Sequence, residues 1–519
     1  MSLLGKRHKF ISASHLRYYF ENDGLNYWLK FCNKQLCNNY NDNNYNKYNF
    51  FDWLMEQGIE YEKKVINKLH KKFEIIDKIR FTKERKYKMI SQAYLRDEDK
   101  RMQGNVDLVI HSSEVLKLLK NLTKEENEFI KQQDLTKDFY VVADIKMSNI
   151  KINKDGFLNN DSKVKYYKSQ LYFYRELVDK NVPFSLIISK NKTENNSGNP
   201  LSKGLYSVSV INWEKENFEL TYRDALSFCF NILDNGDKWK IGKKSIRDEL
   251  KPNMNISQTQ IGKDIAERTG EITRLWRCGV KHRTIAKNNG FSSYKNKKLR
   301  AKHLGFKGKN EVILDSILKA YRSKKKFIME EKRDIPTKNG KEYFVDFEYC
   351  YYKEDTINFM IGVGYEDNNE WKFKCFYVNK LNNKEEERIY KDFIEFVGDN
   401  PCYHWSQAEP NTFKAGVIKY KFNKTPNFQD LLPLFRDNRI VFKNQFNFGL
   451  KEVSKCALEQ GFIKTKWNDS IYDGLSAITM VLKTVNTKDF KNTMREVSIY
   501  NEVDCKVMWE LLGFLRSKI

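Results

Sequence analysis

The order of helix-like and strand-like segments in the first half of the chain is the feature that most restricts its fold. Helical spacing of apolar residues, short apolar runs and Gly-, Asn- and Ser-rich turns can be told apart along the sequence. The pattern predicts a helix over 51–72, strands over 104–111 and 139–148, a helix over 164–178, two strands between 185 and 211, and a helix over 213–233. Together these segments predict an α/β domain that ends near residue 245.

The pattern changes twice beyond this point. Residues 255–326 lack strand patterning and are rich in Lys and Arg, which indicates a basic helical insert. After Pro336, strand-like runs return at 342–350, 358–365 and 371–378, followed by helical segments. A chain of 519 residues exceeds one ordinary hydrophobic core. The sequence therefore predicts an α/β domain over 1–245, a basic helical linker domain over 246–330 and a second α/β domain over 331–519.

The charge balance favours a polyanionic partner. The formal net charge is +25, and Lys and Arg side chains that neutralise phosphates release condensed counterions and so drive binding. Nucleic acid is the leading candidate. The alternative is the codon bias of an AT-rich genome, which inflates Lys, Asn, Ile, Tyr and Phe and agrees with the Asn-rich run at 37–44.

Composition also restricts location and redox chemistry. No stretch approaches the roughly 18 consecutive apolar residues of a membrane span, and residues 1–7 lack the apolar core of a signal peptide. We therefore expect a soluble, intracellular protein with no membrane partner. The 9 cysteines are scattered, and only Cys32 and Cys37 lie close together, which predicts reduced structural cysteines.

Acidic residues interrupt apolar strands in the first α/β segment. Hydrolysis of a phosphodiester needs a divalent cation, so carboxylates must converge on one point. Asp107 lies in one apolar strand, and the next ends in Asp144 and Lys146, which point to the same face. Gln170 and Tyr174 share one face of the following helix, and Glu62 on the earlier helix is a third carboxylate. Each element alone is unspecific.

Taken together, the motifs G-x-x-x-E, G-x-x-D, D-x-K and Q-x-x-x-Y resemble those of the PD-(D/E)xK nucleases, in their RecB-like and CRISPR-adaptation-type branch. The resemblance implies a restriction-endonuclease-like fold that binds Mg²⁺ or Mn²⁺. It implies these roles: Asp107 and Asp144 as metal ligands, Glu62 as an additional ligand, Lys146 as the catalytic lysine, and Gln170 and Tyr174 as accessory residues. Asp144 stands where the family usually has Glu, and Glu60 competes with Glu62 for the first motif.

Some members of this branch hold an iron-sulfur cluster through four cysteines. Here Cys32 and Cys37 have no second pair near the end of the domain, so we expect no iron-sulfur cluster.

A second acidic constellation lies in the C-terminal segment. Asp346 and Glu348 share one face of a strand, and Tyr500 and Asp504 share one face of a helix. The pattern resembles the DEDD-type 3′–5′ exonucleases of the RNase H-like fold. The middle carboxylate of that family has no clear equivalent, so either Glu409 substitutes for it or the site is degenerate. A fold retained for DNA binding or dimer contacts is the alternative.

The basic insert offers a surface for nucleic acid. We expect DNA contacts from Arg274, Arg277, Lys281, Arg283, Lys297, Lys298 and Arg300. The interleaved aromatic residues Trp276, Phe291, Tyr294 and Phe306 either stack on bases or form the core of a small domain. No groove-reading motif is visible, which predicts little sequence preference.

The sequence as a whole predicts a Mg²⁺- or Mn²⁺-dependent deoxyribonuclease, an exonuclease with endonuclease activity left open. The domain order resembles a family of uncharacterised RecB-like nucleases, and the Asn- and Lys-rich composition resembles that of large-DNA-virus proteins, which implies viral defence in the host cytoplasm or virus factory. The alternatives are a nucleic-acid-binding scaffold with degenerate sites and a 3′–5′ exonuclease that works from the C-terminal domain alone. A homodimer is also left open.

Overall fold

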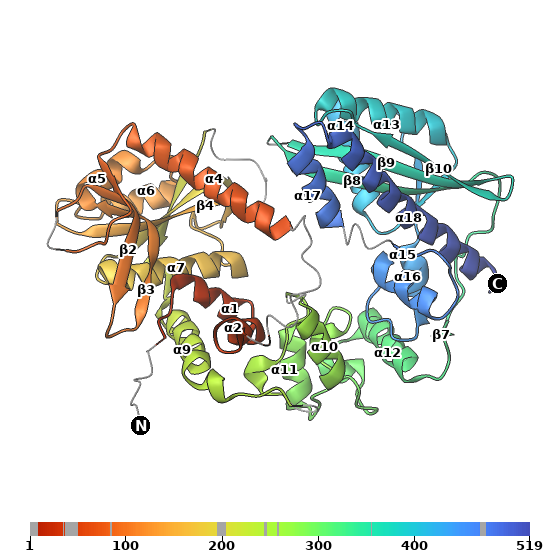
Figure 1. Ribbon diagram of the computed structural model, residues 1–519, viewed down its shortest axis with the longest axis horizontal. Helices are drawn as coiled ribbons and strands as arrows, with labels where there is room; N and C mark the ends of the chain where they lie inside the picture. Colours follow the sequence, from red (N-terminus) through yellow and green to blue (C-terminus); the bar gives the residue numbers. More distant parts are fainter. Residues whose placement is uncertain are drawn as a thin grey trace. The chain divides into compact units, whose positions relative to one another are not determined.

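The computed structural model describes residues 9–34, 36, 50–83, 86–194, 204–242, 246–256, 259–353, 355–467 and 474–518. Two compact units make up the chain (Figure 1). The first comprises Met1–Asn44 and Leu54–Thr269, and the second comprises Tyr45–Trp53 and Gly270–Ile519.

The first unit is built on one mixed sheet of six strands in the order β1-β2-β3-β4-β5-β6. β1 and β2 are parallel, β2, β3 and β4 are antiparallel, β4 and β5 are parallel, and β5 and β6 are antiparallel. The strands are β1 (Ile75–Asp77), β2 (Met89–Asp97), β3 (Met102–His111), β4 (Tyr140–Ile152), β5 (Phe184–Glu194) and β6 (Ser207–Asn212). The strands expected from sequence are found as β3 to β6, whereas β1 and β2 were not predicted.

Helices cover both faces of this sheet. They are η1 (Ala13–Leu16), α1 (Arg17–Phe20), α2 (Gly24–Phe31), α4 (Phe50–His70), α5 (Ser112–Leu118), α6 (Lys124–Lys131), α7 (Ser162–Val178), α8 (Trp213–Glu216), α9 (Glu219–Asn235), η2 (Gly236–Lys238), η3 (Asp248–Leu250) and α10 (Gln260–Thr269). The helix expected over 213–233 is broken into α8 and α9, because Asn217 adopts a left-handed conformation with φ 46°.

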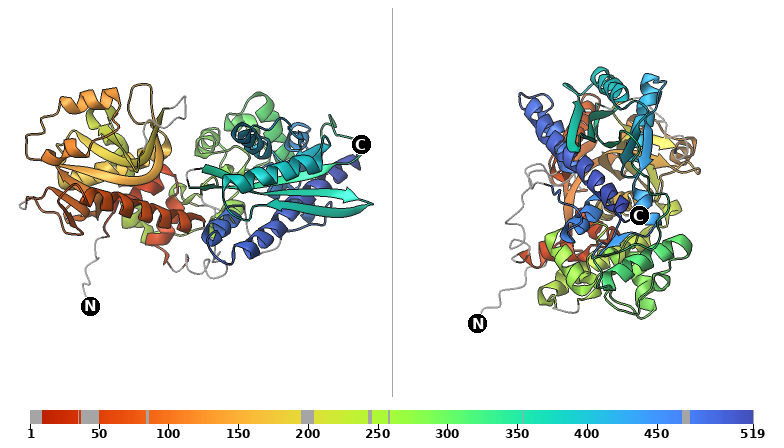
Figure 2. Two further views of the ribbon diagram at one scale, coloured as in Figure 1. Left: turned by 90° about the horizontal axis from the view of Figure 1, so that it is seen from above. Right: turned by 90° about the vertical axis from the view of Figure 1, so that its right-hand side faces the viewer.

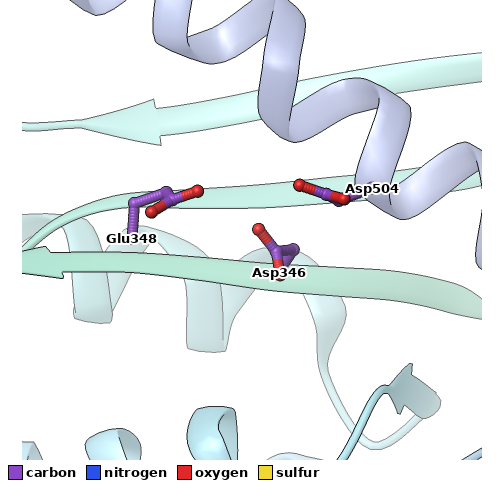
Figure 3. A group of neighbouring side chains, drawn as sticks. All are labelled: Asp346, Glu348 and Asp504. Atoms are coloured by element: carbon purple, nitrogen blue, oxygen red, sulfur yellow. The ribbon is translucent and has the colours of Figure 1, made fainter. Parts of the chain in front are cut away.

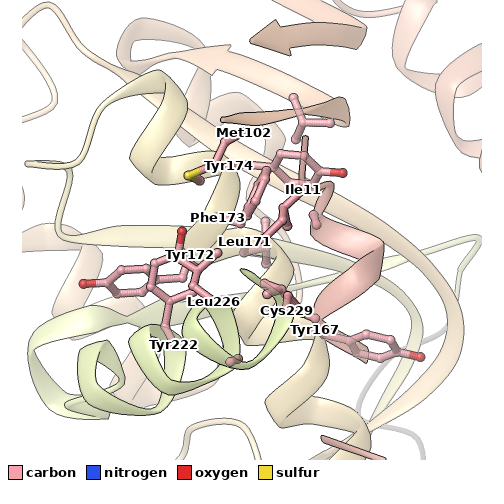
Figure 4. Close-up of a cluster of buried hydrophobic side chains, with 14 of the residues drawn as sticks. Ile11, Met102, Tyr167, Leu171, Tyr172, Phe173, Tyr174, Tyr222, Leu226 and Cys229 are labelled. Atoms are coloured by element: carbon pink, nitrogen blue, oxygen red, sulfur yellow. The ribbon is translucent and has the colours of Figure 1, made fainter. Parts of the chain in front are cut away.

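The alternation of side chains along β4 divides the interior into two cores. Val142 joins a core with α7 and α9, whereas Val141 and Ala143 face a second core with α4. Figure 4 shows the first core, in which large side chains of α7 and α9 interdigitate: Tyr167, Leu171, Tyr172, Phe173, Tyr174, Tyr222, Leu226 and Cys229. The parallel and antiparallel strands are thus buried from both sides.

The first half of α4 differs from the expectation of a buried apolar face. Tyr61, Val65 and Leu69 are buried in the second half of the helix. In the first half Phe51 and Met55 are 68% and 62% exposed. Helical spacing of apolar residues therefore predicted the helix correctly but overestimated the length over which it packs on the sheet.

The second unit contains a five-stranded sheet in the order β10-β9-β8-β11-β12. Three antiparallel strands, β8 (Tyr343–Tyr352), β9 (Asp355–Asp367) and β10 (Glu370–Tyr377), are followed on the other side of β8 by the parallel strands β11 (Pro401–His404) and β12 (Asn427–Asp430). The long helix α18 (Phe490–Arg516) lies along β8 and β9, as Figures 1 and 2 show from three directions. No helix in the described part of the chain has the length and apolarity needed to cross a membrane.

The remaining elements of the second unit pack around this sheet. They are η4 (Ile272–Arg274), α11 (Val280–Asn288), η5 (Ala301–Leu304), α12 (Gly308–Arg322), β7 (Phe327–Ile328), α13 (Asn383–Val397), α14 (Ala408–Tyr420), α15 (Leu432–Asp437), β13 (Val441–Phe442), α16 (Leu450–Glu459) and α17 (Gly474–Thr484). The expected strands at 342–350, 358–365 and 371–378 correspond to β8, β9 and β10.

The basic helical segment shares its core with the C-terminal sheet. Tyr294 packs edge-on against Tyr321 and lies 5.0 Å from Phe446, measured between ring centroids. Tyr294 and Phe306 are buried in the same core as Phe344 on β8. Because of this packing, the boundary between the units falls between residues 269 and 270, inside the segment that the sequence predicts as a linker domain.

A buried ion pair under the first sheet gives a stability prediction. The side chains of Lys192 and Glu126 are fully buried and paired, and Glu126 also accepts hydrogen bonds from the backbone N–H groups of Thr123 and Val210. Breaking such a pair leaves one buried charge uncompensated. We expect Lys192→Met to lower the free energy of unfolding of the first unit by about 3–5 kcal/mol.

The matched variant is the double change Lys192→Met with Glu126→Gln. Chemical denaturation measures the free energy of unfolding of the wild type and of both variants. Because the double variant leaves no buried charge without a partner, its free energy of unfolding should fall less than that of Lys192→Met alone. Additive losses from the two changes would contradict this account.

Candidate active sites

Three carboxylates converge in the second unit. Asp346 and Glu348 are two residues apart on β8 and therefore project from the same face, and Asp504 approaches them from α18 (Figure 3). One carboxylate oxygen of each lies within 4.8 Å of the others. We call these residues the carboxylate triad. In the described part of the chain, no other group of three His, Cys, Asp or Glu side chains is as close.

A glycine on β9 allows α18 to approach β8 closely. Gly362 pairs with Asp346 in the antiparallel register, and a Cβ atom at this position would lie 1.6 Å from Asn501 Oδ1. The buried Asn501 donates a hydrogen bond of 2.6 Å to Asp346 Oδ2. Asn501 is three residues before Asp504 on α18, so the same contact holds the helix and orients one member of the triad.

The triad is electrostatically strained by burial of like charges. Burial raises the pKa of Glu348 to about 8, and the charge of Asp504 adds to the shift. Burial raises the pKa of Asp504 to about 6, although the positive charge of Lys451 opposes the shift. The pKa of Asp346 is raised well above its usual range by burial and by the other two carboxylates. An all-oxygen donor set with this repulsion fits a divalent cation.

Glu409 is a fourth carboxylate at the triad. It lies in the first turn of α14, is 5% exposed, and its negative charge raises the pKa of all three triad carboxyl groups. His404 Nδ1 at the end of β11 lies 3.5 Å from Glu409 Oε2. That oxygen has no hydrogen-bond partner among the described residues. Glu409 thus interacts electrostatically with the triad but is not part of the group whose oxygens lie within 4.8 Å of one another.

Two aromatic side chains support Asp504. Tyr500, one turn earlier on α18, hydrogen-bonds to Asp504, as the sequence-based pairing of the two residues required. Trp467 Nε1 donates a hydrogen bond of 3.1 Å to Asp504 Oδ1. Lys451 on α16 lies with its ammonium 4.7 Å from the centre of the Tyr500 ring. Lys451, Trp467 and Asn501 were not identified from sequence, because only the fold brings them to Asp504 and Asp346.

The first unit holds a second cluster at the junction of β3 and β4. Lys146 Nζ lies 2.6 Å from Asp144 Oδ2, and Asp107 Oδ2 accepts a hydrogen bond of 2.7 Å from the backbone N–H of Ile145. Burial, the charge of Asp144 and a hydrogen bond between the two carboxyl groups raise the pKa of Asp107 well above its usual range. Burial lowers the pKa of Lys146, but the charges of Asp144 and Asp107 outweigh it and raise this pKa.

Glu62 reaches this cluster through Gln92. The Gln92 amide donates hydrogen bonds to Glu62 and, at 3.3 Å, to Asp107 Oδ1. Glu60, the competing first-motif residue, points to solvent and pairs with Lys64 at 2.7 Å. The sequence-based preference for Glu62 thus agrees with the geometry. Gln92 was missed because β2 was not predicted and its left-handed conformation, with φ 51°, breaks the strand alternation.

Gln170 and Tyr174 both face the buried side of α7. Gln170 is 8% exposed, and its Oε1 has no hydrogen-bond partner among the described residues. Tyr174 packs against Gly104, where a Cβ atom would lie 3.2 Å from its ring, and burial followed by the charges of Asp144 and Asp107 raises its pKa well above the usual range. Tyr166 also interacts electrostatically with Lys146 and was not identified from sequence.

The basic residues proposed for DNA binding divide into two groups. Arg283 pairs with the buried Glu271 at 3.2 Å, and the guanidinium of Arg274 lies 4.4 Å from the centre of the Phe446 ring, so both contribute to packing. The other five are exposed: Arg277, Lys281, Lys297, Lys298 and Arg300. Of the interleaved aromatics, Tyr294 and Phe306 belong to the core, which favours the structural alternative for these two.

Comparison with known proteins adds one finding to this geometry. Residues 343–516 match the family model of the RNase H superfamily. The matched segment runs from the first residue of β8 to the last residue of α18 and so contains the triad, Glu409 and Tyr500. No curated protein matches the chain. The second unit therefore has an RNase H-like region, which supports nuclease activity on nucleic acid.

The close approach at Gly362 gives a prediction for the helix that carries Asp504. Gly362→Ala places a methyl group against Asn501 and pushes α18 away from the sheet. We expect a loss of about 1–3 kcal/mol in the free energy of unfolding of the second unit. Gly513→Ala on the same helix is the control, because its Cβ meets no atom within 4 Å. Equal effects of the two changes in calorimetry would rule out the contact as the cause.

Repulsion within the triad gives a second prediction. In the presence of chelator at about pH 9, where Glu348 with its pKa of about 8 is ionised, Glu348→Gln removes one of the buried like charges, so we expect it to raise the free energy of unfolding by an amount on the order of 1–3 kcal/mol. Mn²⁺ at 100 times its Kd should stabilise the wild type by about 2.7 kcal/mol and the variant by much less. Thermal unfolding with and without Mn²⁺ measures both effects. A variant less stable than the wild type in chelator would contradict the repulsion.

Proposed function

We propose that the second unit is a nuclease that hydrolyses phosphodiester bonds of DNA with Mg²⁺ or Mn²⁺ at the carboxylate triad. The observation that carries this proposal is the convergence of Asp346, Glu348 and Asp504 within 4.8 Å in a region that matches the RNase H superfamily. Buried carboxylates that repel one another reduce stability, and a cation held between them offsets that cost. The net charge of +25 supports a nucleic-acid substrate.

Each residue around the triad has a role in this proposal. Asp346, Glu348 and Asp504 would hold the metal, and a divalent cation bound there would supply neutralisation of phosphate charge and activation of water. Glu409 Oε2 would accept a proton from the attacking water, and His404, whose Nδ1 lies 3.5 Å away, would hold the Glu409 carboxyl group in place. Lys451 attracts the phosphate. Trp467 and Tyr500 fix the orientation of Asp504 by hydrogen bonds.

The resemblance to DEDD-type enzymes favours 3′–5′ exonuclease action, with endonuclease activity as the alternative. Glu409 would then serve as the middle carboxylate, in place of the usual Asp. Contacts through phosphates, without a groove-reading element, favour low sequence specificity.

A second nuclease site in the first unit is the other candidate. The Asp107, Asp144 and Lys146 cluster supports it, because two neighbouring carboxyl groups with an ammonium 2.6 Å from Asp144 Oδ2 resemble the D-x-K arrangement of RecB-like, restriction-endonuclease-like enzymes. The buried Gln170 Oε1, without a hydrogen-bond partner among the described residues, supports a missing ligand there. Viral defence would be the setting that the family resemblance implies.

The test is cleavage of end-labelled linear DNA and of circular DNA with Mg²⁺, Mn²⁺ or chelator. We expect Glu348→Gln to reduce cleavage at least about 10²-fold, because it removes a charge that holds the metal at the reacting phosphate. Chelator should abolish the activity of the wild type. Full activity of Glu348→Gln would overturn the assignment to the second unit.

The control variant for the first unit is Asp144→Asn in the same assays. If it retains cleavage while Glu348→Gln loses it, the triad alone carries the activity. If Asp144→Asn alone loses cleavage, the chemistry belongs to the RecB-like candidate instead. Comparison of linear with circular substrates distinguishes exonuclease from endonuclease action.

A further inference from the structure

A groove in the second unit is lined by lysines and by apolar side chains, two of them aromatic. It is lined by residues from the end of α12, from β7 and from the segment after α18, and has a volume of about 690 Å³. Its lining lysines, here called the rim, are Lys319, Lys325, Lys326, Lys332 and Lys518. Its lining apolar residues, here called the floor, are Phe327, Ile328, Met329 and Phe462. We call it the lysine groove.

The charge of the lysine groove is almost entirely positive. Its one acidic lining residue, Glu330, is paired with Lys319 at 2.8 Å and with Arg439 at 2.6 Å, so its charge is already compensated. The other four lysines form no ion pair with a carboxylate among the described residues. Lys326 Nζ donates to the backbone carbonyl of Gln460 at 3.0 Å, and Lys332 Nζ donates to the backbone carbonyl of Lys518. The rim therefore presents ammonium groups suited to phosphates.

The floor adds a surface for flat apolar groups. Phe327 and Phe462 are partly exposed and lie 5.1 Å apart with their rings nearly perpendicular. The ammonium of Lys326 lies 5.9 Å from the centre of the Phe462 ring, which places cation and aromatic side by side. Phosphate-binding cations next to aromatic faces are the combination that binds unpaired bases and their backbone. A duplex, whose bases are stacked inside, could not use this floor.

The groove is set apart from the triad along the axis of α18. Lys518 follows Asp504 by 14 residues, and at about 1.5 Å rise per residue this corresponds to roughly 21 Å. A volume of 690 Å³ lies in the range of ligand pockets, about 300–1,000 Å³, so it accommodates individual nucleotides of a strand rather than a helix.

We propose that the lysine groove binds a single-stranded segment of nucleic acid at a position remote from the triad. The proposal rests on the proposed function for its substrate class. Lys325, Lys326 and Lys332 contact consecutive phosphates, and the floor receives unstacked bases. The groove thereby retains a strand whose end or cleavage point occupies the triad, which favours single-stranded or frayed substrates.

The experiment measures binding of fluorescent oligothymidylate and oligouridylate to the full chain by anisotropy in chelator, so that no cleavage is needed. The variant is Lys325→Glu with Lys326→Glu. The matched control is Lys380→Glu with Lys384→Glu, two exposed lysines of the same unit that do not line the groove. The variant should weaken binding at least about tenfold and flatten the slope of log K against log salt by about 1.4, at about 0.7 for each lost phosphate contact.

A second measurement uses the wild type alone. Photo-crosslinking of a strand that contains 4-thiothymidine, with the crosslinked peptides mapped by mass spectrometry, should mark residues 325–332 or Phe462. Unchanged affinity and slope in the groove variant, relative to the control, would overturn the proposal. So would crosslinks confined to other regions, or displacement of the strand by free thymidine monophosphate, which would make the groove a mononucleotide site.

The outcomes separate this inference from the proposed function. Binding that depends on the groove in a protein that cleaves nothing would support the groove and refute the nuclease. Cleavage by a protein whose strand binding does not depend on the groove would support the nuclease and refute the groove.

Discussion

The mutual repulsion of buried carboxylates in the second unit is the constraint on which the rest of that unit depends. Asp346 and Glu348 on the strand precede Asp504 on the helix by 158 and 156 residues, and the pKa values of all three are raised. The packing of α18 on the sheet offsets the unfavourable free energy of this repulsion. Gly362 leaves room for the Asn501 side chain, which donates a hydrogen bond to Asp346. Close packing that holds charges together against repulsion is typical of sites prepared for a cation.

In both units a shift in strand-pairing register follows the acidic cluster, but the charges around the two clusters differ. The pairing register shifts after Lys146 on β4 and after Glu348 on β8, so the cluster residues of each strand lie just before an irregularity in the strand pairing. In the first unit Lys146 lies against Asp144 and compensates it. In the second unit Lys451 opposes the pKa shift of Asp504 but does not cancel it. The carboxylate triad therefore has less of its negative charge compensated by a cation than the cluster of the first unit, which favours the triad as the metal site.

Much of this arrangement could be predicted from sequence, because it depends on local periodicity. The two-residue spacing of Asp346 and Glu348 and the four-residue spacing of Tyr500 and Asp504 define strand and helix faces directly. What could not be predicted depends on register and long-range packing. Gln92 lies in a strand whose alternation is interrupted, and Trp467 and Asn501 acquire their partners only through the fold. The exposed first half of α4 shows the same limit, since apolar spacing does not reveal what covers a helix.

Anomalous X-ray diffraction from crystals of the full chain grown with Mn²⁺ would locate the bound metal. We expect an anomalous peak between the carboxylates of Asp346, Glu348 and Asp504, at manganese–oxygen distances typical of a hard cation. A peak confined to the Asp107 and Asp144 cluster, or the absence of a peak at the triad with Mn²⁺ bound elsewhere, would contradict the claim that the second unit holds the catalytic metal.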